Sequence, residues 1–264
     1  MLYLGKYKLL KNYIYAVDID YVLNIIIKAI NKNQEVLLAP VPSHILVTAF
    51  FDNNFNNILN SYDYLLPDSV WIKNALNFLY GSKLPKNIRG TDLMLEICKL
   101  SQKFNFKIYM YGTNKNTLYK LEKKLLEKFP QLKIVGKEES KYQNLTLMEK
   151  KTLIKNITLC KPNIIFIGLS SPMQQEFAYG LCKVEPKLTI KSIVIPVGAA
   201  FDFISGTKKE APVWLQKAGF EWFFRIISEP RRLWKRYIIE GTLFIILSLF
   251  QKILMTMGRN IKIL

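Results

Sequence analysis

Residues 163–177, NIIFIGLSSPMQQEF, decide the fold of this chain. Asn163–Ile167 is an almost uniformly apolar run of strand length, and Gly168 follows it directly. A strand without polar alternation is covered on both faces, which is typical of a parallel sheet. In the loop that follows, Ser171 suits the N-cap of a helix and Pro172 suits its first position. The stretch predicts a buried strand, a loop and a helix.

The same unit recurs along the chain. Further strands are expected at Glu35–Ala39, Lys107–Tyr111, Leu132–Val135 and Ile193–Val197. Helices are expected at 20–32, 70–80, 91–104, 116–128, 146–158, 172–184 and 212–227. Strands that alternate with helices predict an α/β fold with a mostly parallel sheet and helices on both faces.

The composition describes a folded, basic protein. Half of the 264 residues are hydrophobic and the net charge is +18, from 38 Lys+Arg against 20 Asp+Glu. This balance favours nucleic acid, anionic lipid or phosphorylated metabolites as partners, although a lysine-rich proteome would explain many of the lysines. The scattered Cys98, Cys160 and Cys182 indicate reduced thiols in the cytosol, and no signal peptide is expected at the N-terminus.

Glycines stand where four of the predicted strands end: Gly112, Gly136, Gly168 and Gly198. In an open α/β sheet, ligands bind beyond the carboxyl ends of the strands, and glycine lets the backbone come close to them. The alternative is that each glycine only makes a tight turn.

Two loops carry candidate binding groups. The start of the helix after Gly168, with Ser171 and Gln174, can bind an anion through exposed amides and the helix dipole. A capping box, Ser171-x-x-Gln174, would explain the same residues. Asp202, between apolar residues of VGAAFDFISG, can bind a sugar or a base, or can be a satisfied buried carboxylate. Neither GxGxxG nor GxxxxGK[ST] occurs.

Asp68, in PDSVW before a predicted helix, can act as a general base. An aspartate at a helix start is more often a cap. His44 is the only histidine, and no zinc spacing or nucleophile pair is present. We therefore expect no metal and no cofactor.

The stretch from Trp214 to Tyr237 combines aromatic residues with five cations: Arg225, Arg231, Arg232, Lys235 and Arg236. An apolar run at 241–250 follows, too short to cross a bilayer, which needs about 20 residues. A tilted span extended to Gly258, which takes in Lys252, is the second choice. On a continuous helix Arg225, Arg232 and either Lys235 or Arg236 would share one face, although Pro230 interrupts it. The face is either a clamp for a diphosphate or a stripe for lipid headgroups. We predict a sheet domain at 1–229 and a helical, membrane-associating appendage at 230–264.

These motifs, in this order, resemble the WecG/TagA/CpsF family of bacterial glycosyltransferases from about residue 16 to about residue 240. The matching segments are LPDSVW, IRGTDLM, IYMYG, KFPQLKIVG, GLSSPMQQEF, VGAAFDFISGTKKEAPVW and GFEWFFRIISEPRRLWKRY. The resemblance implies a Rossmann-like domain with a C-terminal membrane-binding appendage. It also implies metal-independent, inverting transfer of a sugar, often of the N-acetylmannosamine type, in cell-surface polysaccharide synthesis. The donor would be a UDP-sugar, and the acceptor a polyprenyl-diphosphate-linked sugar at the cytoplasmic membrane face.

Carried over to this chain, the resemblance makes Asp68 the base, and Arg225, Arg232 and Arg236 the cations that offset the charge of the leaving diphosphate. The candidate substrate- or nucleotide-binding residues are Gly112, Gly136, Gly168, Ser171, Gln174, Gly198, Asp202 and Lys235. The protein would be cytoplasmic and peripheral on the inner face of the membrane, and its apolar tail can mediate self-association.

The chain departs from the family pattern at several positions. Ala39-Pro40-Val41 replaces Thr-x-Asn on the loop after an early strand, Ser69 replaces glycine, Lys86-Asn87 replaces Glu-Arg, Gln175 replaces glutamate, and Glu210 replaces arginine. These changes leave open a different donor sugar. They also leave open a non-catalytic homologue that binds a nucleotide sugar or partners other glycosyltransferases. A nucleic-acid binder is the third alternative, but no helix-turn-helix, RRM or zinc pattern supports it, so no nucleic-acid partner is expected.

Overall fold

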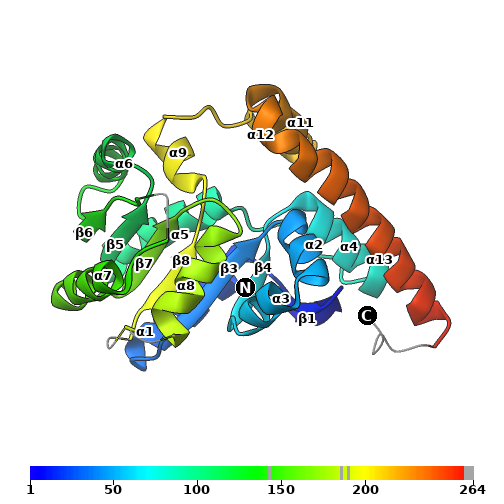
Figure 1. The fold of residues 1–264 in the computed structure, drawn as a ribbon, viewed down its shortest axis with the longest axis horizontal. Helices are drawn as coiled ribbons and strands as arrows, with labels where there is room; N and C mark the ends of the chain where they lie inside the picture. The colour runs from blue at the N-terminus through cyan, green and yellow to red at the C-terminus, as the bar shows by residue number, and fades with distance from the viewer. Residues whose placement is uncertain (142–143, 185–186, 189–190, 259–264) are drawn as a thin grey trace.

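The computed structural model describes residues 1–141, 144–184, 187–188 and 191–258. A six-stranded sheet with the order β4-β3-β8-β7-β5-β6 lies at its centre (Figure 1). Every registered pair in it is parallel, so the predicted mostly parallel sheet is confirmed. The strands are β3 (Val36–Val41), β4 (Tyr64–Pro67), β5 (Lys107–Gly112), β6 (Lys133–Glu138), β7 (Ile164–Gly168) and β8 (Ile193–Pro196).

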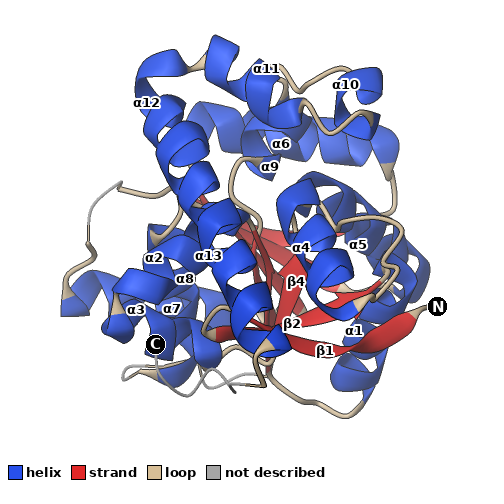
Figure 2. Ribbon diagram, turned by 90° about the vertical axis from the view of Figure 1, so that its right-hand side faces the viewer, coloured by secondary structure: helices blue, strands red, loops and turns tan. Residues whose placement is uncertain are grey.

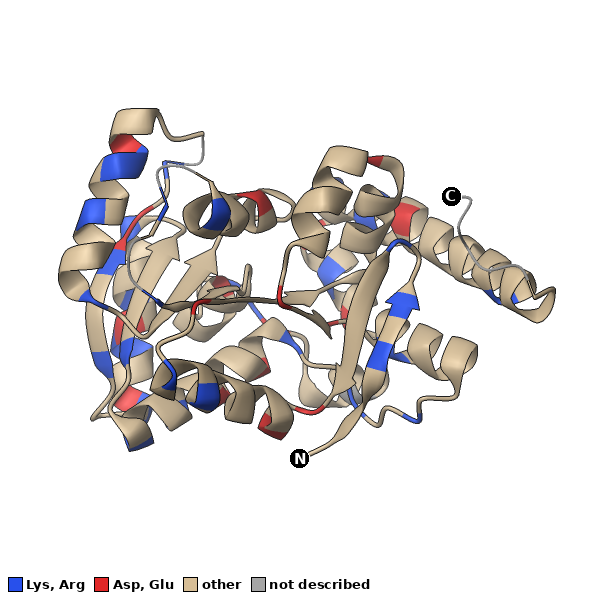
Figure 3. Ribbon diagram, turned by 90° about the horizontal axis from the view of Figure 1, so that it is seen from below, with Lys and Arg blue, Asp and Glu red and all other residues tan. Residues whose placement is uncertain are grey.

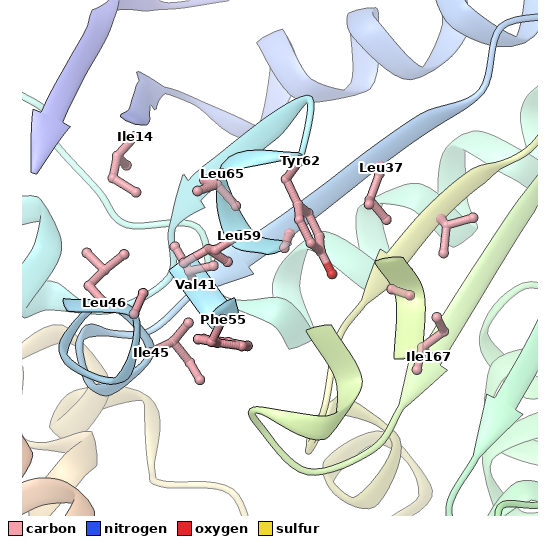
Figure 4. Packing of buried hydrophobic residues seen from close by; sticks show 14 of the residues in the cluster. Ile14, Leu37, Val41, Ile45, Leu46, Phe55, Leu59, Tyr62, Leu65 and Ile167 are labelled. Atoms are coloured by element: carbon pink, nitrogen blue, oxygen red, sulfur yellow. The ribbon is translucent and has the colours of Figure 1, made fainter. Parts of the chain in front are cut away.

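The strands are apolar throughout because both faces of the sheet are covered. In β7, Ile165 and Ile167 belong to one core cluster, whereas Ile164 and Phe166 belong to the other. The first cluster, part of which is drawn in Figure 4, includes residues of α2 (Ser43–Phe51), α3 (Asn53–Asn60), α4 (Val70–Tyr80), α7 (Leu147–Cys160) and α8 (Met173–Lys183). The second includes residues of α1 (Ile19–Asn31), α5 (Gly90–Phe104), α6 (Lys115–Lys128) and α9 (Ala200–Ser205).

Several expected elements differ from the observed ones. The expected ranges contain no counterpart of β4, α2, α3 or α9, nor of an antiparallel hairpin, β1 (Tyr3–Leu9) with β2 (Asn12–Val17). The helix predicted at 212–227 is two helices, α10 (Val213–Lys217) and α11 (Glu221–Ser228), because the chain turns at Gly219 with a φ of +80°. The strand predicted at 132–135 continues to Glu138, so Gly136 lies inside β6 and not after it.

The C-terminal segment is helical but not continuous with α11. At Glu229 the backbone leaves the helical conformation (φ −139°, ψ 62°), so one helix face through Arg225 and Arg232 does not exist. After this break come α12 (Pro230–Trp234), a π-helical turn η1 (Lys235–Ile239) and α13 (Glu240–Thr256). Figure 2 shows this segment descending from α11 past α4.

Helix α13 is attached to the sheet domain through a narrow buried strip made by Phe244, Ser248 and Gln251. The side chain of Gln251 accepts a hydrogen bond from the Leu10 amide (2.9 Å) and donates one to the Lys8 carbonyl (2.8 Å). These bonds tie the end of the chain to the β1–β2 hairpin.

The outer face of α13 is apolar and exposed, with Ile245, Ile246, Leu249, Phe250 and Ile253 at its surface. Its only charged residues are Glu240 and Lys252, and most of its ribbon is uncharged in Figure 3. By length and composition the helical run Pro230–Thr256, 27 residues, could cross a membrane, which the apolar run at 241–250 alone could not. Residues 259–264 of the predicted appendage lie outside the described part of the chain.

Candidate active site

A cleft of about 550 Å³ opens at the carboxyl ends of the strands. Residues that follow β3, β4, β5, β7 and β8 line one side of it, as expected for an open α/β sheet. Residues of α11, α12 and η1 line the other side. The cleft therefore brings Asp68 and Arg232, which are far apart in sequence, to one cavity.

Asp68 directly follows β4, but it does not cap the next helix. The N-cap of α4 is Ser69, whose hydroxyl accepts the amide of Ile72 (3.3 Å). This leaves the Asp68 carboxylate free to accept the Gly90 amide at 3.0 Å, while the Asn87 side chain donates to the Asp68 carbonyl. The Gly90 amide therefore fixes the orientation of the carboxylate, and the Asn87 side chain holds the main chain at Asp68.

The carboxylate of Asp68 is harder to ionise than an ordinary aspartate. Burial, and next the negative charge of Glu221, raise its pKa to about 6, against the lowering effects of the Gly90 amide, Arg89 and Arg225. A base with this pKa is ionised at neutral pH and is a stronger proton acceptor than an exposed aspartate.

The predicted cations differ in how far their charge is neutralised. Arg232 is exposed and makes a two-point ion pair with Glu229, at 2.7 and 2.8 Å. This pair holds the pKa of Glu229 at about 2. In the described part of the chain, neither Arg225 nor Arg236 forms an ion pair with a carboxylate, although Arg225 lies 5.2 Å from the ring of Phe203.

Lys235 does not join this group. It does not line the cleft, and its ammonium lies 5.7 Å from the ring centre of the neighbouring Trp234. The predicted choice between Lys235 and Arg236 is therefore decided for Arg236, which lines the cleft.

The sequence analysis missed His44 as a site residue because a lone histidine has no spacing to interpret. Its Nδ1 atom accepts a hydrogen bond from Nε of Arg236 at 2.9 Å. Burial, then the charges of Arg236 and Arg225, place the pKa of His44 well below its usual value. The imidazole is therefore neutral, with its proton on Nε2.

The loop after β7 faces the cleft but is not the capping box that its sequence indicates. Pro172 occupies the N-cap of α8, not the first helical position. The hydroxyl of Ser171 accepts the side-chain amides of Gln174 (2.8 Å) and Gln175 (3.4 Å), not a backbone amide. Within the described chain the buried Oε1 of Gln174 has no partner, so it can accept a hydrogen bond from a ligand.

The four candidate glycines divide into two pairs. Gly168 and Gly198 line the cleft, and Gly198 has a φ of +55°. Gly112 and Gly136 do not: a Cβ at Gly112 would lie 2.4 Å from the carbonyl oxygen of Gly168, and one at Gly136 would meet the ring of Tyr109. These two glycines allow close packing of the strands, and the cleft gives no support to their predicted binding role.

Asp202, on α9, lines the cleft and is paired with Lys208 at 3.3 Å. Lys208 also lies 3.3 Å from Glu229. Asp202 is therefore a paired but partly exposed carboxylate in the lining of the cleft, not a buried one, and its contact with a sugar or a base stays a prediction.

Arg89, the N-cap residue of α5, ties α11 to the sheet domain through ion pairs, and it was not among the predicted site residues. Its guanidinium, 13% exposed, pairs with Glu221 of α11 (3.0 Å), with Asp92 (3.4 Å) and with Glu210. Burial opposes its charge, but these three acids raise its pKa. Glu210, one of the departures from the family pattern, is thus the partner of a buried cation.

The residues Ala39-Pro40-Val41, which depart from the family pattern, lie in a strand and not in the expected loop. These residues end strand β3 and do not form a loop, and the side chains of Ala39 and Val41 are in the core. The polar residues that this end of the sheet offers to the cleft are Ser43 and His44. Within the described residues no group of three or more His, Cys, Asp or Glu could hold a metal ion.

Comparison with known proteins identifies the family. The model of the glycosyl transferase WecG/TagA/CpsF family matches residues 7–257. The N-acetylglucosaminyldiphosphoundecaprenol N-acetyl-beta-D-mannosaminyltransferase of Bacillus subtilis (strain 168) is 28% identical over 209 residues, which cover 79% of this chain and 77% of that enzyme. An enzyme of the same name from Staphylococcus aureus (strain MW2) is 23% identical over 176 residues, 67% of this chain and 65% of the relative. The chain therefore belongs to the WecG/TagA/CpsF family of glycosyltransferases.

Proposed function

We propose that this protein transfers a sugar from a UDP-sugar to a polyprenyl-diphosphate-linked sugar, with inversion at the anomeric carbon. The observation that carries the proposal is the cleft itself, which sets Asp68 at the sheet against Arg225 of α11 and Arg236 of the appendage. The names of the bacterial relatives, which specify a lipid-linked N-acetylglucosamine acceptor and N-acetylmannosamine transfer, support the substrate class.

In the proposed reaction Asp68 accepts the proton of the acceptor hydroxyl as its oxygen attacks the anomeric carbon. The bond from that carbon to the UDP oxygen breaks, and UDP leaves with the bonding electron pair. Attack from the side opposite UDP inverts the configuration. A single base with a pKa near 6 suits this displacement, which needs no covalent sugar–enzyme intermediate.

The leaving UDP gains negative charge, and α11 and the appendage offer cations to balance it. Arg225 and Arg236 are the best candidates because no carboxylate in the described chain pairs with either of them. Fixed cations in a partly closed cleft stabilise such a charge strongly. We propose that they do the work that a divalent metal does in other glycosyltransferases, so the activity should persist in EDTA.

We also propose that the appendage holds the protein on the cytoplasmic face of the membrane. The exposed apolar face of α13 supports contact with hydrocarbon, as do exposed Trp214, Phe223 and Ile227 of the preceding helices α10 and α11. Gln251 is hydrogen-bonded to the β1–β2 hairpin, and Lys252 is hydrogen-bonded to the Leu79 carbonyl of α4. These bonds hold α13 along the sheet domain, which favours a helix that lies on the bilayer over one that crosses it. A boundary at residue 230 fits the break at Glu229.

The test is UDP release from a panel of UDP-sugars with a polyprenyl-diphosphate-linked N-acetylglucosamine acceptor. We expect acceptor-dependent release with one N-acetylhexosamine donor, unchanged by EDTA. Binding of UDP without turnover of any donor would favour the non-catalytic homologue. Absence of UDP binding would refute the proposal.

A further inference from the structure

The buried His44 and the partly buried Arg236 form a pair between the sheet domain and the appendage. His44 is the second residue of α2 and is 7% exposed. Arg236 lies in the π-helical turn η1, and its Nε donates to Nδ1 of His44 at 2.9 Å. π-helical turns are rare and often occur at functional sites, because the wider turn re-aims its side chains.

A buried guanidinium usually has a carboxylate partner, and here it has an imidazole. Burial lowers the pKa of Arg236 to about 10, so the guanidinium stays charged at neutral pH. His44 stays neutral because burial and two nearby arginines oppose its protonation. The pair therefore has a net charge of about +1.

Arg232 provides the contrast within the same cleft. Its partner is the carboxylate of Glu229, which accepts two hydrogen bonds from the guanidinium, so much of the charge of Arg232 is cancelled locally. Glu229 also contacts Lys208. A carboxylate in place of His44 would do the same to Arg236. A neutral acceptor fixes the direction of the guanidinium without reducing its charge.

We infer that His44 is a positioning residue, which holds Arg236 toward the cleft and leaves its whole charge for the diphosphate of the nucleotide. The inference rests on the proposed function, because it names the anion as the diphosphate of UDP. His44 itself is not one of the arginines of the family motif. If it only positions Arg236, the charge of the side chain at position 44 should affect UDP affinity more than its shape does.

The matched test is His44→Asn against His44→Asp, with UDP and uridine affinities measured by calorimetry on the full chain. Both side chains can place an oxygen near the position of Nδ1, and they differ by one charge. We expect His44→Asn to bind UDP within about threefold of the wild type, and His44→Asp to bind it roughly tenfold or more weakly. Uridine, which lacks phosphate, should bind both variants equally, which also confirms that both are folded.

A double-mutant cycle covers the case in which His44→Asp does not fold. His44→Leu removes the acceptor and should weaken UDP binding alone, but it should add little in the Arg236→Gln background. Equal UDP affinities of the Asn and Asp variants, or full additivity of the Leu and Gln changes, would overturn the inference. Failure of the wild type to bind UDP is a different result, since it would remove the proposed function itself.

Discussion

Replacement of Asp68 by asparagine should stabilise the protein at neutral pH while it abolishes transfer. Burial raises the pKa of Asp68 from 3.8 to about 6, so the folded chain resists ionisation of this group. One pKa unit corresponds to about 1.36 kcal/mol, so ionised Asp68 costs the fold up to ~3 kcal/mol. Asparagine carries no charge, and its Oδ1 can still accept the Gly90 amide.

The free energy of unfolding should decrease with rising pH, because the folded chain holds the Asp68 proton more tightly than the unfolded chain does. Between pH 3.8 and about 6 the unfolded chain has lost the Asp68 proton while the folded chain keeps it, so stability falls as pH rises through this window. The full cost is present above about pH 7 and absent below pH 3.8. The Asp68→Asn variant should therefore exceed the wild type by up to ~3 kcal/mol at pH 8 and match it at pH 4.

The assay is thermal unfolding of both proteins at the two pH values, with UDP release measured in parallel. For a chain of this size, 3 kcal/mol corresponds to about 6–12 °C in melting temperature. In the wild type, kcat/KM should rise with pH through about 6 as Asp68 ionises. A variant less stable than the wild type at pH 8 would refute the desolvation argument, and retained turnover would remove Asp68 as the base.

Three further outcomes are expected. Arg89→Gln removes the cation from three partly exposed acids, so it should cost about 1–3 kcal/mol in urea unfolding. It should also raise the pH at which kcat/KM increases, because Arg89 lowers the pKa of Asp68. The exposed Arg231→Gln is the control and should do neither. Replacement of both Ile246 and Leu249 by serine should weaken binding to anionic vesicles roughly tenfold or more without changing the melting temperature, because both side chains are exposed. Undiminished binding would exclude the outer face of α13 from lipid contact. Gly168→Ala would set a Cβ 2.3 Å from a phenylalanine ring and should cost about 1–3 kcal/mol, so wild-type stability would contradict the packing.

The sequence was sufficient for the elements that are apolar and long. Strands β5, β7 and β8 begin and end within one residue of the expected ranges, because burial on both faces leaves a continuous apolar run. Strand β4, YLLP, was missed because it lacks the β-branched residues that mark β8, a strand of the same length. The β1–β2 hairpin was missed because lysines and tyrosines obscure its alternation.

The candidate site was predictable where a residue's position along the chain fixes its place in the fold. Asp68, Gly168, Gln174 and Gly198 follow strands of one parallel sheet, so their meeting at one edge follows from topology. The choice between Lys235 and Arg236 depends on the winding of a π-helical turn, which side-chain spacing does not reveal.

Net charge was the least informative part of the sequence for locating the site, and the ion pairs explain why. The excess of 38 cations over 20 acids predicts anion binding but not the place where it occurs. In the cleft, acids accompany most of the cations: Glu229 pairs with Arg232, and Glu221 and Glu210 pair with Arg89. A cation contributes to binding an anion in proportion to the charge that its neighbours leave uncancelled. Among the described arginines of the cleft, this condition selects Arg225 and Arg236, so their substitution should reduce UDP affinity more than substitution of Arg232. Equal losses for all three would show that the arrangement of acids around the cations does not govern binding.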